Sequence, residues 1–330
     1  MAKYTSIGGQ ALIEGIMMKS PEKTALGVRV PDGSIDVTYL EQRSLKDKCK
    51  ILRLPIIRGV ISFIEAMIQG YKAMMLSAEK SGFTDLEEEK GEKKETDKKK
   101  ENIIISIVMV LGSVLGVLLA MALFMLLPRL CVGGLEWLFA TSFSKFVRSG
   151  IEQIIKLAVF VLYVYLVSFM KDIKRVFMYH GAEHKTIFCY EKGLELTVEN
   201  VRKQTRFHPR CGTSFLILMI IISVIFSTVV QMIFPEVYNI YWLWVIVKIL
   251  LLPIICGAGF EVLKICGRYD NWFTKIISAP GLWLQRITTK EPEDGMIEVA
   301  IAALKACEPK VPDVDRSVDA QTNEVDNDNI

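Results

Sequence analysis

Four stretches of the chain are nearly free of charge and long enough to cross a bilayer as helices, for which about 20 residues are required. They cover residues 103–127, 154–170, 215–234 and 241–263. The last contains Lys248, and ionisable residues inside membrane spans usually have a function or a partner. The pattern predicts an α-helical integral membrane protein with four spans, in which Lys248 is a candidate for a transport role.

Basic residues are distributed unevenly among the polar segments. Residues 1–102 carry 18 Lys and Arg, the 128–153 loop 3, the 171–214 loop 9, the 235–240 turn none, and residues 264–330 carry 8. Because basic residues mark the cytoplasmic side of a membrane, we expect both termini and the 171–214 loop to be cytoplasmic. An even number of spans also requires both termini on one side.

Alternation of apolar and polar positions predicts β-structure in the cytoplasmic segments. Residues 26–30 and 35–39 alternate on either side of a Pro-Asp-Gly turn at 31–33, which is typical of a hairpin. A weaker pattern at 186–196 predicts a second hairpin, followed by a short helix over 198–205 that Thr197 would cap. We therefore expect a small cytoplasmic α+β part beside the spans.

The remaining segments complete the predicted organisation. Residues 1–84 form a cytoplasmic N-terminal segment that contains the first hairpin and an amphipathic helix over 54–79, lying on the membrane or packed on the spans. A linker at 85–101, in which 14 of 17 residues are charged, leads into a membrane domain over 102–263. Cytoplasmic helices follow over 264–307, including an amphipathic one at 296–307, and then a disordered acidic tail at 308–330.

Composition agrees with a membrane protein that has a sizeable aqueous part. Hydrophobic residues make up 51% of the 330 residues, while charged residues still reach 23%. The net charge of +3 gives no reason to expect a nucleic-acid partner. The seven cysteines are an odd number without a Cys-x-x-Cys pair, which indicates free thiols in a reducing compartment.

The candidate chemistry lies in the middle cytoplasmic loop, which contains all three histidines of the chain. His180 and His184 are four residues apart and share one face if the segment is helical. With Glu183 they form His-x-x-Glu-His, in which two imidazoles bind a metal and the carboxylate takes the proton of the attacking water. His208 is expected to be the third ligand and Cys211 a possible fourth, and the set suits zinc or a similar divalent transition metal.

Other interpretations of these residues remain open. A single His-x-x-Glu-His is short enough to arise by chance, and isolated histidines more often make hydrogen bonds than bind metals. Cys211 could instead be a nucleophile that a nearby histidine activates, as in thiol hydrolases. The site would lie at the cytoplasmic membrane surface, because His180 follows the second predicted span by ten residues and Cys211 precedes the third by four.

Several longer motifs occur together along the chain. They are GGQALIEGIMM at 8–18, HGAEHKT at 180–186, LTVEN at 196–200, HPRCGTSF at 208–215 and LQRITTKEP at 284–292, followed by EVA at 298–300. In these motifs the chain resembles the YqhQ-type family of bacterial membrane proteins, catalogued as domain of unknown function number 1385. The resemblance extends over about residues 4 to 306, which is nearly the whole chain.

The resemblance implies a multi-pass protein of the bacterial cell membrane and a metal-dependent enzyme, a label that rests on the same His, Glu and Cys residues. It also points to Gln10 and Glu14 as further site residues, with Glu14 a candidate catalytic group. The leading hypothesis is a metal-dependent hydrolase that faces the cytoplasm and acts on a lipid or a membrane protein in the bilayer. The alternatives are a non-enzymatic scaffold or regulator with a structural metal, and a transporter that uses Lys248.

Overall fold

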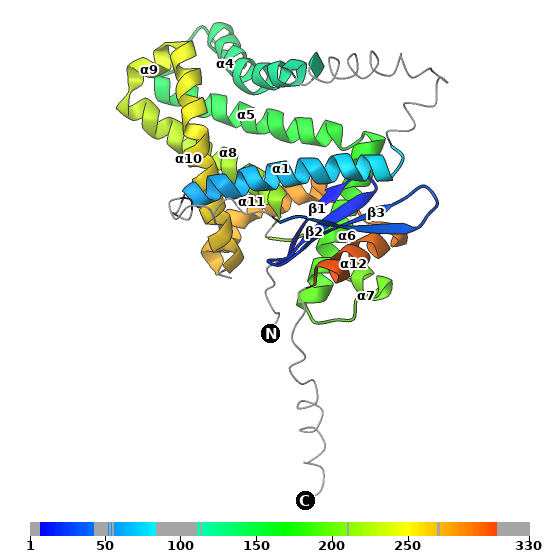
Figure 1. The fold of residues 1–330 in the computed structure, drawn as a ribbon. Coiled ribbons are helices and arrows are strands. Elements are labelled where there is room, and N and C mark those ends of the chain that lie inside the picture. The colour runs from blue at the N-terminus through cyan, green and yellow to red at the C-terminus, as the bar shows by residue number, and fades with distance from the viewer. Residues whose placement is uncertain are drawn as a thin grey trace, which may run out of the picture.

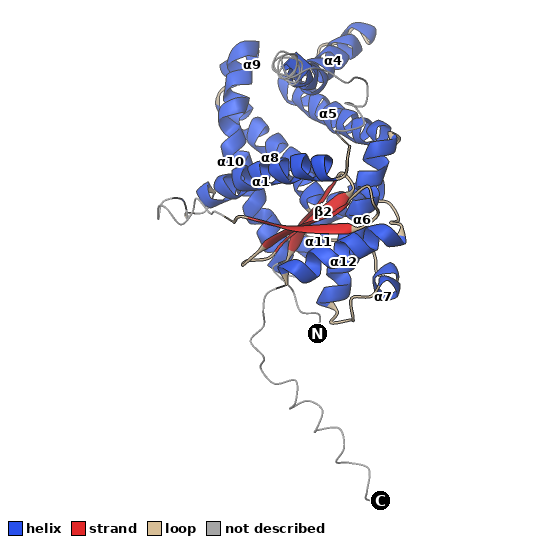
Figure 2. Cartoon of the chain, turned by 45° about the vertical axis from the view of Figure 1, so that its right-hand side comes forward, coloured by secondary structure: helices blue, strands red, loops and turns tan. Residues whose placement is uncertain are grey.

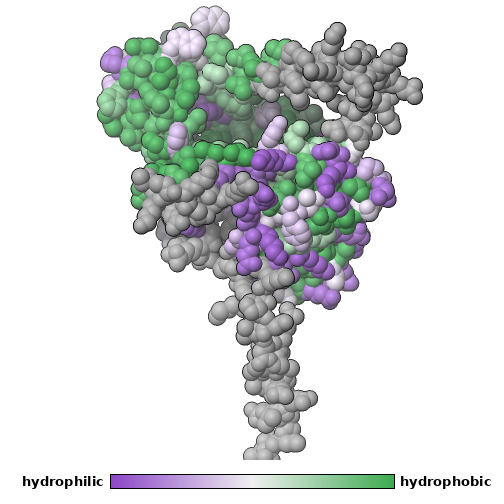
Figure 3. All heavy atoms as spheres, viewed as in Figure 1, coloured by the Kyte–Doolittle hydropathy of each residue, from purple (hydrophilic) through white to green (hydrophobic). Residues whose placement is uncertain are grey.

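The computed structural model describes residues 7–42, 52, 54, 56–83, 111–112, 114–209, 211–268 and 271–308. A sheet with its covering helices forms a polar domain, and the longest apolar helices lie on one side of it (Figures 1 and 2). In the space-filling view, hydrophobic residues gather over these helices and hydrophilic residues over the polar domain (Figure 3). The charged linker at 85–101 and the tail from residue 309 lie outside the described residues.

A four-stranded antiparallel sheet forms the N-terminal part of the polar domain. Its strands are β1 (Gly8–Leu12), β2 (Gly15–Lys19), β3 (Thr24–Arg29) and β4 (Ile35–Leu40), in the order β1-β2-β3-β4. The hairpin predicted around the Pro-Asp-Gly turn is confirmed as β3–β4, and Gly33 supplies the positive φ of 85° that its turn requires. The β1–β2 hairpin was not predicted, because residues 8–18 do not alternate in hydrophobicity.

Helices cover both faces of the sheet. On one face lies α1 (Ile57–Lys80), which packs around Leu12, Met17 and Leu26. On the other lie α6 (Lys171–Glu191) and α12 (Asp294–Cys307), which pack around Ile16 and Met18. Successive residues of a strand point to opposite faces, so β2 contributes to both cores.

The second predicted hairpin is wrong. Residues 186–190 belong to α6, which continues to Glu191 and is followed by Gly193 with a positive φ of 67°. The alternation there was too short to distinguish a strand from the end of a helix, and a glycine in this conformation is typical of a helix C-terminus. The next helix is confirmed as α7 (Val198–Arg202), with the Thr197 side chain accepting a hydrogen bond from the Asn200 backbone N–H.

Within the described residues, four helices are long and apolar enough to cross a membrane, in agreement with the predicted number. Their candidate spans are Val114–Leu138, Phe146–Val167, Gly212–Ile233 and Trp242–Cys266. The first includes the π-helix η3 (Ala122–Leu126) and α4 (Leu127–Leu138), and the others lie in α5 (Lys145–Val167), α8 (Gly212–Ile233) and α10 (Tyr241–Arg268). The short α9 (Pro235–Asn239) separates α8 from α10.

The first two spans extend into the segment that was predicted to be a loop at 128–153. The prediction ended the first span before Arg129 and began the second after Glu152, whereas α4 and α5 continue through these residues. They can do so because the charges pair between the helices: Arg148 on α5 forms ion pairs with Glu136 on α4 and with Glu152 one turn along α5.

α1 packs on both the sheet and α10, while α11 (Trp272–Thr288) packs on α8, α10 and α5. Arg58 on α1 donates two hydrogen bonds, of 2.6 and 2.5 Å, to the carboxylate of Glu261 on α10. Beside this pair, Gly59 approaches Gly257 so closely that a Cβ on Gly59 would lie 2.9 Å from the Gly257 backbone. The helix predicted at 54–79 therefore packs on a candidate span through an ion pair that accounts for one charge of each helix.

Candidate metal centre

α6 carries three of the predicted site residues on one face. His180, Glu183 and His184 lie within one turn of each other, where a helix brings positions three and four apart together. All three are buried, with 8%, 5% and 1% of their surfaces exposed. Such burial of ionisable groups is uncommon and indicates partners or a ligand.

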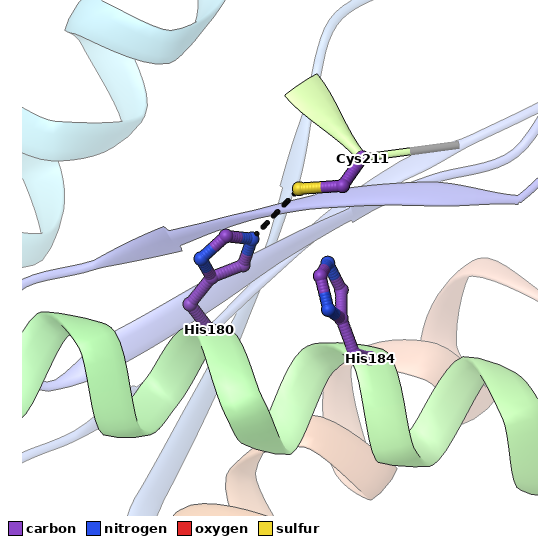
Figure 4. A group of neighbouring side chains, drawn as sticks. All are labelled: His180, His184 and Cys211. Atoms are coloured by element: carbon purple, nitrogen blue, oxygen red, sulfur yellow. Dashed lines mark hydrogen bonds between the residues drawn. The ribbon is translucent and has the colours of Figure 1, made fainter. Parts of the chain in front are cut away.

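Cys211 joins the two histidines from a segment 27 residues further along the chain, counted from His184. It is the N-cap of α8, immediately before the third candidate span begins at Gly212. Its Sγ lies 3.0 Å from Nε2 of His180, and the side chains of His180, His184 and Cys211 converge on one point (Figure 4). The ligand atoms of all three lie within 4.8 Å of one another.

Backbone carbonyls orient both imidazoles. Nδ1 of His180 lies 2.9 Å from the carbonyl oxygen of Thr288, and Nδ1 of His184 lies 2.5 Å from that of Arg206. Because a carbonyl can only accept, each Nδ1 donates its proton, and each Nε2 keeps its lone pair for the site. This is the arrangement by which proteins fix histidine ligands of a metal.

The donor set fits a divalent transition metal. In a tetrahedral zinc site, Zn–N bonds of about 2.1 Å and Zn–S bonds of about 2.3 Å place the ligand atoms about 3.5 Å apart. Burial lowers the pKa of His184, which favours the neutral imidazole that binds metals. Among the described residues, Nε2 of His184 is buried and has no hydrogen-bond partner, a cost that a bound cation would remove.

Cys211 is surrounded by groups that stabilise a thiolate. Burial alone would raise its pKa, but a positive charge at the His184 ring and hydrogen bonds from Thr213 outweigh this, and the pKa is lowered; a bound cation would supply that charge where the ring is neutral. The Thr213 hydroxyl and backbone N–H lie 3.1 and 3.4 Å from the sulfur. A thiolate is the form of cysteine that acts as a metal ligand or a nucleophile.

Glu183 lies beside the three ligands, close enough for the charges of His180 and Cys211 to act on its carboxyl group. Burial raises the pKa of Glu183 to about 8, although it accepts a hydrogen bond from the backbone N–H of Gly9. Its Oε2 is buried without a hydrogen-bond partner in the described part of the chain. Gly9 allows this approach, since a Cβ there would lie 2.8 Å from the Glu183 side chain.

His208 is adjacent to the group but does not belong to it. Its ring centroid lies 5.6 Å from that of His184, while its Nε2 lies 3.6 Å from a carboxylate oxygen of Glu191. The backbone of His208 is held by Gln285, whose fully buried amide accepts from the His208 N–H and donates to its carbonyl at 2.8 and 2.7 Å. The structure thus places Cys211, and not His208, with the two histidines of α6.

The structure does not bring Glu14 or Gln10 into this group. Glu14 lies in the β1–β2 turn with a φ of 50°, and its carboxylate accepts two hydrogen bonds, of 2.5 and 2.6 Å, from Arg175 on α6. Gln10 points to the opposite face of the sheet from Gly9, where it packs against Gly70 of α1. In this geometry Glu14 ties the sheet to α6, and Gln10 contacts α1.

Lys248 lies in α10, away from the three ligands. Its Nζ is 5.2 Å from the ring centroid of Trp244, one turn along the same helix. Lys156, Glu152 and Arg129 lie close enough for their charges to act on it. Lys248 therefore belongs to a second group of ionisable residues, within the candidate spans.

Sequence reasoning missed the residues that position the ligands. Thr288 and Arg206 act through their backbone carbonyls. Every residue has a carbonyl, so the residue type does not reveal this role. Gly181 is required because a Cβ there would lie 2.0 Å from the carbonyl oxygen of Lys290. The conspicuous motifs at 8–18 and 284–292 were the available signal, and they supply Gly9, Thr288 and Gln285 around the site.

A family model described as "Protein of unknown function (DUF1385)" matches residues 54–310. The chain belongs to the DUF1385 family. It is 37% identical over 295 residues to "Uncharacterized protein YqhQ" of Bacillus subtilis (strain 168), a match that covers 89% of each chain. No solved structure matches it. Within the DUF1385 match lie all four residues of the candidate site, whereas the sheet that supplies Gly9 precedes it.

Proposed function

We propose that this protein is a metal-dependent membrane enzyme of the hydrolase type. His180, His184 and Cys211 hold the metal, and Glu183 is the general base. The observation that carries the proposal is the combination of three converging ligand atoms with a buried carboxylate beside them whose Oε2 has no partner in the described residues. Three protein ligands leave a coordination position open, which is typical of catalytic sites and not of structural ones.

The residues around the metal would have different roles in the reaction. A divalent metal bound there would supply Lewis acidity and make water a nucleophile at neutral pH. The cation would lower the raised pKa of Glu183, and the ionised carboxylate would then take the proton of the attacking water and return it to the leaving group. The carbonyls of Thr288 and Arg206 keep both Nε2 atoms aimed at the site, and the Gly9 N–H holds the carboxylate of Glu183 in place.

The position of the site suggests the class of substrate. Cys211 directly precedes a candidate span, so the ligands lie at the end of an apolar helix. With the orientation given by the basic residues, this end faces the cytoplasm. We infer that the substrate is a lipid or a membrane protein whose scissile bond reaches the cytoplasmic surface of the bacterial cell membrane.

Metal analysis of the purified full chain tests the proposal. We expect about one transition metal per chain, zinc in particular, in the wild type. His184→Ala should lose it, because two remaining ligands bind far more weakly, and His208→Ala is the matched control that should retain it. A wild type without metal under non-chelating conditions would refute the proposal, and metal loss in His208→Ala would show a closed four-ligand site.

A second candidate function is a non-enzymatic membrane scaffold or regulator, in which the metal is structural. The observation that favours it is the burial of all three ligands, since structural sites are closed. In that case the metal would fix the segment before α8 to α6 and stabilise the polar domain. The two functions differ in what they require of Glu183, which is needed for a hydrolase and dispensable for a structural metal.

A further inference from the structure

The two faces of α11 are reversed relative to a helix in a water-soluble domain. Trp272, Ile276 and Trp283 are each more than half exposed, and spacings of four and seven residues place them on one face. The buried residues of this helix are mostly small or polar: Thr274, Ser278, Gly281, Leu284, Gln285 and Thr288. Large apolar side chains outside and small or polar ones against the protein are typical of helices that contact lipid.

α1 has the same reversed arrangement. Its buried residues are all small: Gly59, Gly70, Ala73, Ser77 and Ala78. Its exposed side chains include a stripe of large apolar residues at intervals of three, four or seven: Ile57, Ile64, Ile68, Tyr71 and Met75. Two helices from distant parts of the chain thus present apolar faces that no other described element covers, and exposed apolar patches of this kind mark surfaces that bind a partner or a membrane.

Both helices pack on the first turn of α8, which is a candidate span. The ring of Phe63 on α1 lies 5.8 Å from that of Phe215 on α8, centroid to centroid. Gly281 of α11 approaches Ser214 of α8 so closely that a Cβ on the glycine would lie 2.5 Å from the serine side chain. The exposed faces of α1 and α11 therefore lie at the end of the span that follows Cys211, where a helix that crosses a bilayer meets the membrane surface.

The composition and length of α11 suit the surface of a bilayer and not its interior. Tryptophan is enriched at membrane interfaces, and α11 exposes two of them. The charged residues of the helix, Lys275 and Arg286, are both basic and exposed, as in helices that lie on anionic lipid. Its 17 residues extend about 26 Å, less than the hydrocarbon thickness of about 30 Å, and its buried face is polar.

From the reversed faces, the contacts with α8 and the exposed tryptophans, we infer that α11, together with α1, lies in the bilayer surface with its apolar face inserted among the phospholipids. The buried face of the same helix supports the candidate metal centre: the Thr288 carbonyl accepts from Nδ1 of His180, and Gln285 holds the backbone of His208. Since a helix is about 10 Å across, a single helix separates the metal centre from lipid. The inference concerns lipid contact alone and requires neither a bound metal nor a hydrolase.

Photo-crosslinking of the purified full chain, in vesicles of equal parts phosphatidylglycerol and phosphatidylcholine, tests the inference. The photoreactive residue p-benzoylphenylalanine replaces Ile276, and mass spectrometry of the peptides identifies the products. We expect attachment to lipid acyl chains, at about the level found for the same residue at Leu250, which is exposed on the span helix α10. Tyr39 is the matched control, because it is exposed on β4 opposite Ala25, on the α12 side of the sheet, and its lipid products should be about tenfold fewer or less. Absence of lipid products at Ile276, or products that join two copies of the chain instead, would overturn the inference.

Fluorescence quenching by brominated phosphatidylcholine provides a second test that needs only conservative substitutions. The difference in emission between the wild type and a variant with both Trp272→Phe and Trp283→Phe isolates the signal of these two tryptophans. Bromine near the headgroup end of the acyl chain should quench this signal about twofold more strongly than bromine near the chain end, because an interfacial helix is buried only about 5–10 Å deep. Stronger quenching from the chain end would place α11 inside the hydrocarbon core, and no quenching from either position would place its apolar face away from lipid. Both results contradict an interfacial helix.

Discussion

The candidate metal centre on α6 and the ion pairs between α4 and α5 both bring ionisable side chains together, but different contacts hold those side chains in place. At the metal centre, backbone groups hold the side chains: the carbonyls of Thr288 and Arg206 fix the imidazoles, and the Gly9 N–H contacts Glu183. Between α4 and α5, side chains of opposite charge form ion pairs, as Arg148 does with Glu136. The first arrangement brings three ligand atoms within 4.8 Å of one another, and the second joins two candidate spans through their charges.

Backbone-held geometry should be the more fragile of the two. A backbone carbonyl moves whenever its segment of the chain moves, so a substitution elsewhere in that segment or against it can displace the carbonyl. A charge pair can adjust through flexible side chains. The predictions below test this difference, from the largest expected effect to the smallest.

Glu183→Gln should abolish function without removing the metal. The substitution keeps size and helix propensity but removes the base, and loss of a positioned acid–base group lowers rates by about 10²–10⁴-fold. We expect the variant to fail to complement a deletion strain while its metal content equals that of the wild type. Glu199→Gln, on the exposed α7, is the control that should complement. Normal complementation by Glu183→Gln would leave the metal as a structural element.

Gly181→Ala should disrupt the site from outside it. The added Cβ would lie 2.0 Å from the carbonyl oxygen of Lys290, so the 288–292 segment must move and take the Thr288 carbonyl with it. Overpacking of this kind costs about 1–3 kcal/mol. We expect a lower melting temperature and weaker metal retention during dialysis against a mild chelator. Gly150→Ala on α5, where a Cβ would meet nothing within 4 Å, should change neither.

Gln285→Leu should destabilise the protein by a comparable or slightly smaller amount. The fully buried amide of Gln285 makes hydrogen bonds to both backbone groups of His208 and to the Ser214 hydroxyl. Unpaired buried groups cost about 1–3 kcal/mol each, although relaxation of the loop recovers part of this. Thermal unfolding in detergent measures the loss. An unchanged melting temperature would mean that the 208–214 segment is held by other contacts.

Glu14→Gln should have the smallest effect. Its ion pair with Arg175 is partly exposed, at 24% and 46%, and such pairs contribute about 1 kcal/mol or less. We expect a slightly lower melting temperature with unchanged metal content and normal complementation. If Glu14→Gln instead failed to complement while remaining folded, Glu14 would act in the chemistry, as the family motif first implied.

These sites differ in how far the sequence foretold them. His180, Glu183 and His184 were predictable because a helix period brings them to one face, whereas Cys211 was expected only as a fourth ligand after His208. The choice of Cys211 over His208 as the third group depended on a loop whose path is set by Gln285, 77 residues away. Local patterns contain no information on such distant contacts.

The fold too was predictable only where the signal lies in neighbouring residues. Apolar length predicted four spans, and alternation predicted β3–β4, because both signals lie within a few consecutive residues. The end of α6 and the β1–β2 hairpin were not predicted. Their residues fit contacts with distant parts of the chain and do not follow a regular local hydrophobic pattern. Gly9 serves Glu183, and Gly15 fits against the Gly27 carbonyl, 2.7 Å from where its Cβ would be. The first two spans were ended at the 128–153 segment because the pairing of Arg148 with Glu136 cannot be recognised from either helix alone.

The position of α12 has a consequence for the synthesis of this protein. The helix follows all the other described elements, yet it packs against β2, β3 and β4, which are made first, and eight of its 14 residues are buried. A ribosome must therefore complete nearly the entire polypeptide, and all four spans, before the earliest strands can cover their apolar face. Until then the nascent sheet is a target for chaperones, and a chain truncated before residue 294 should be degraded rather than accumulate as a partly assembled protein.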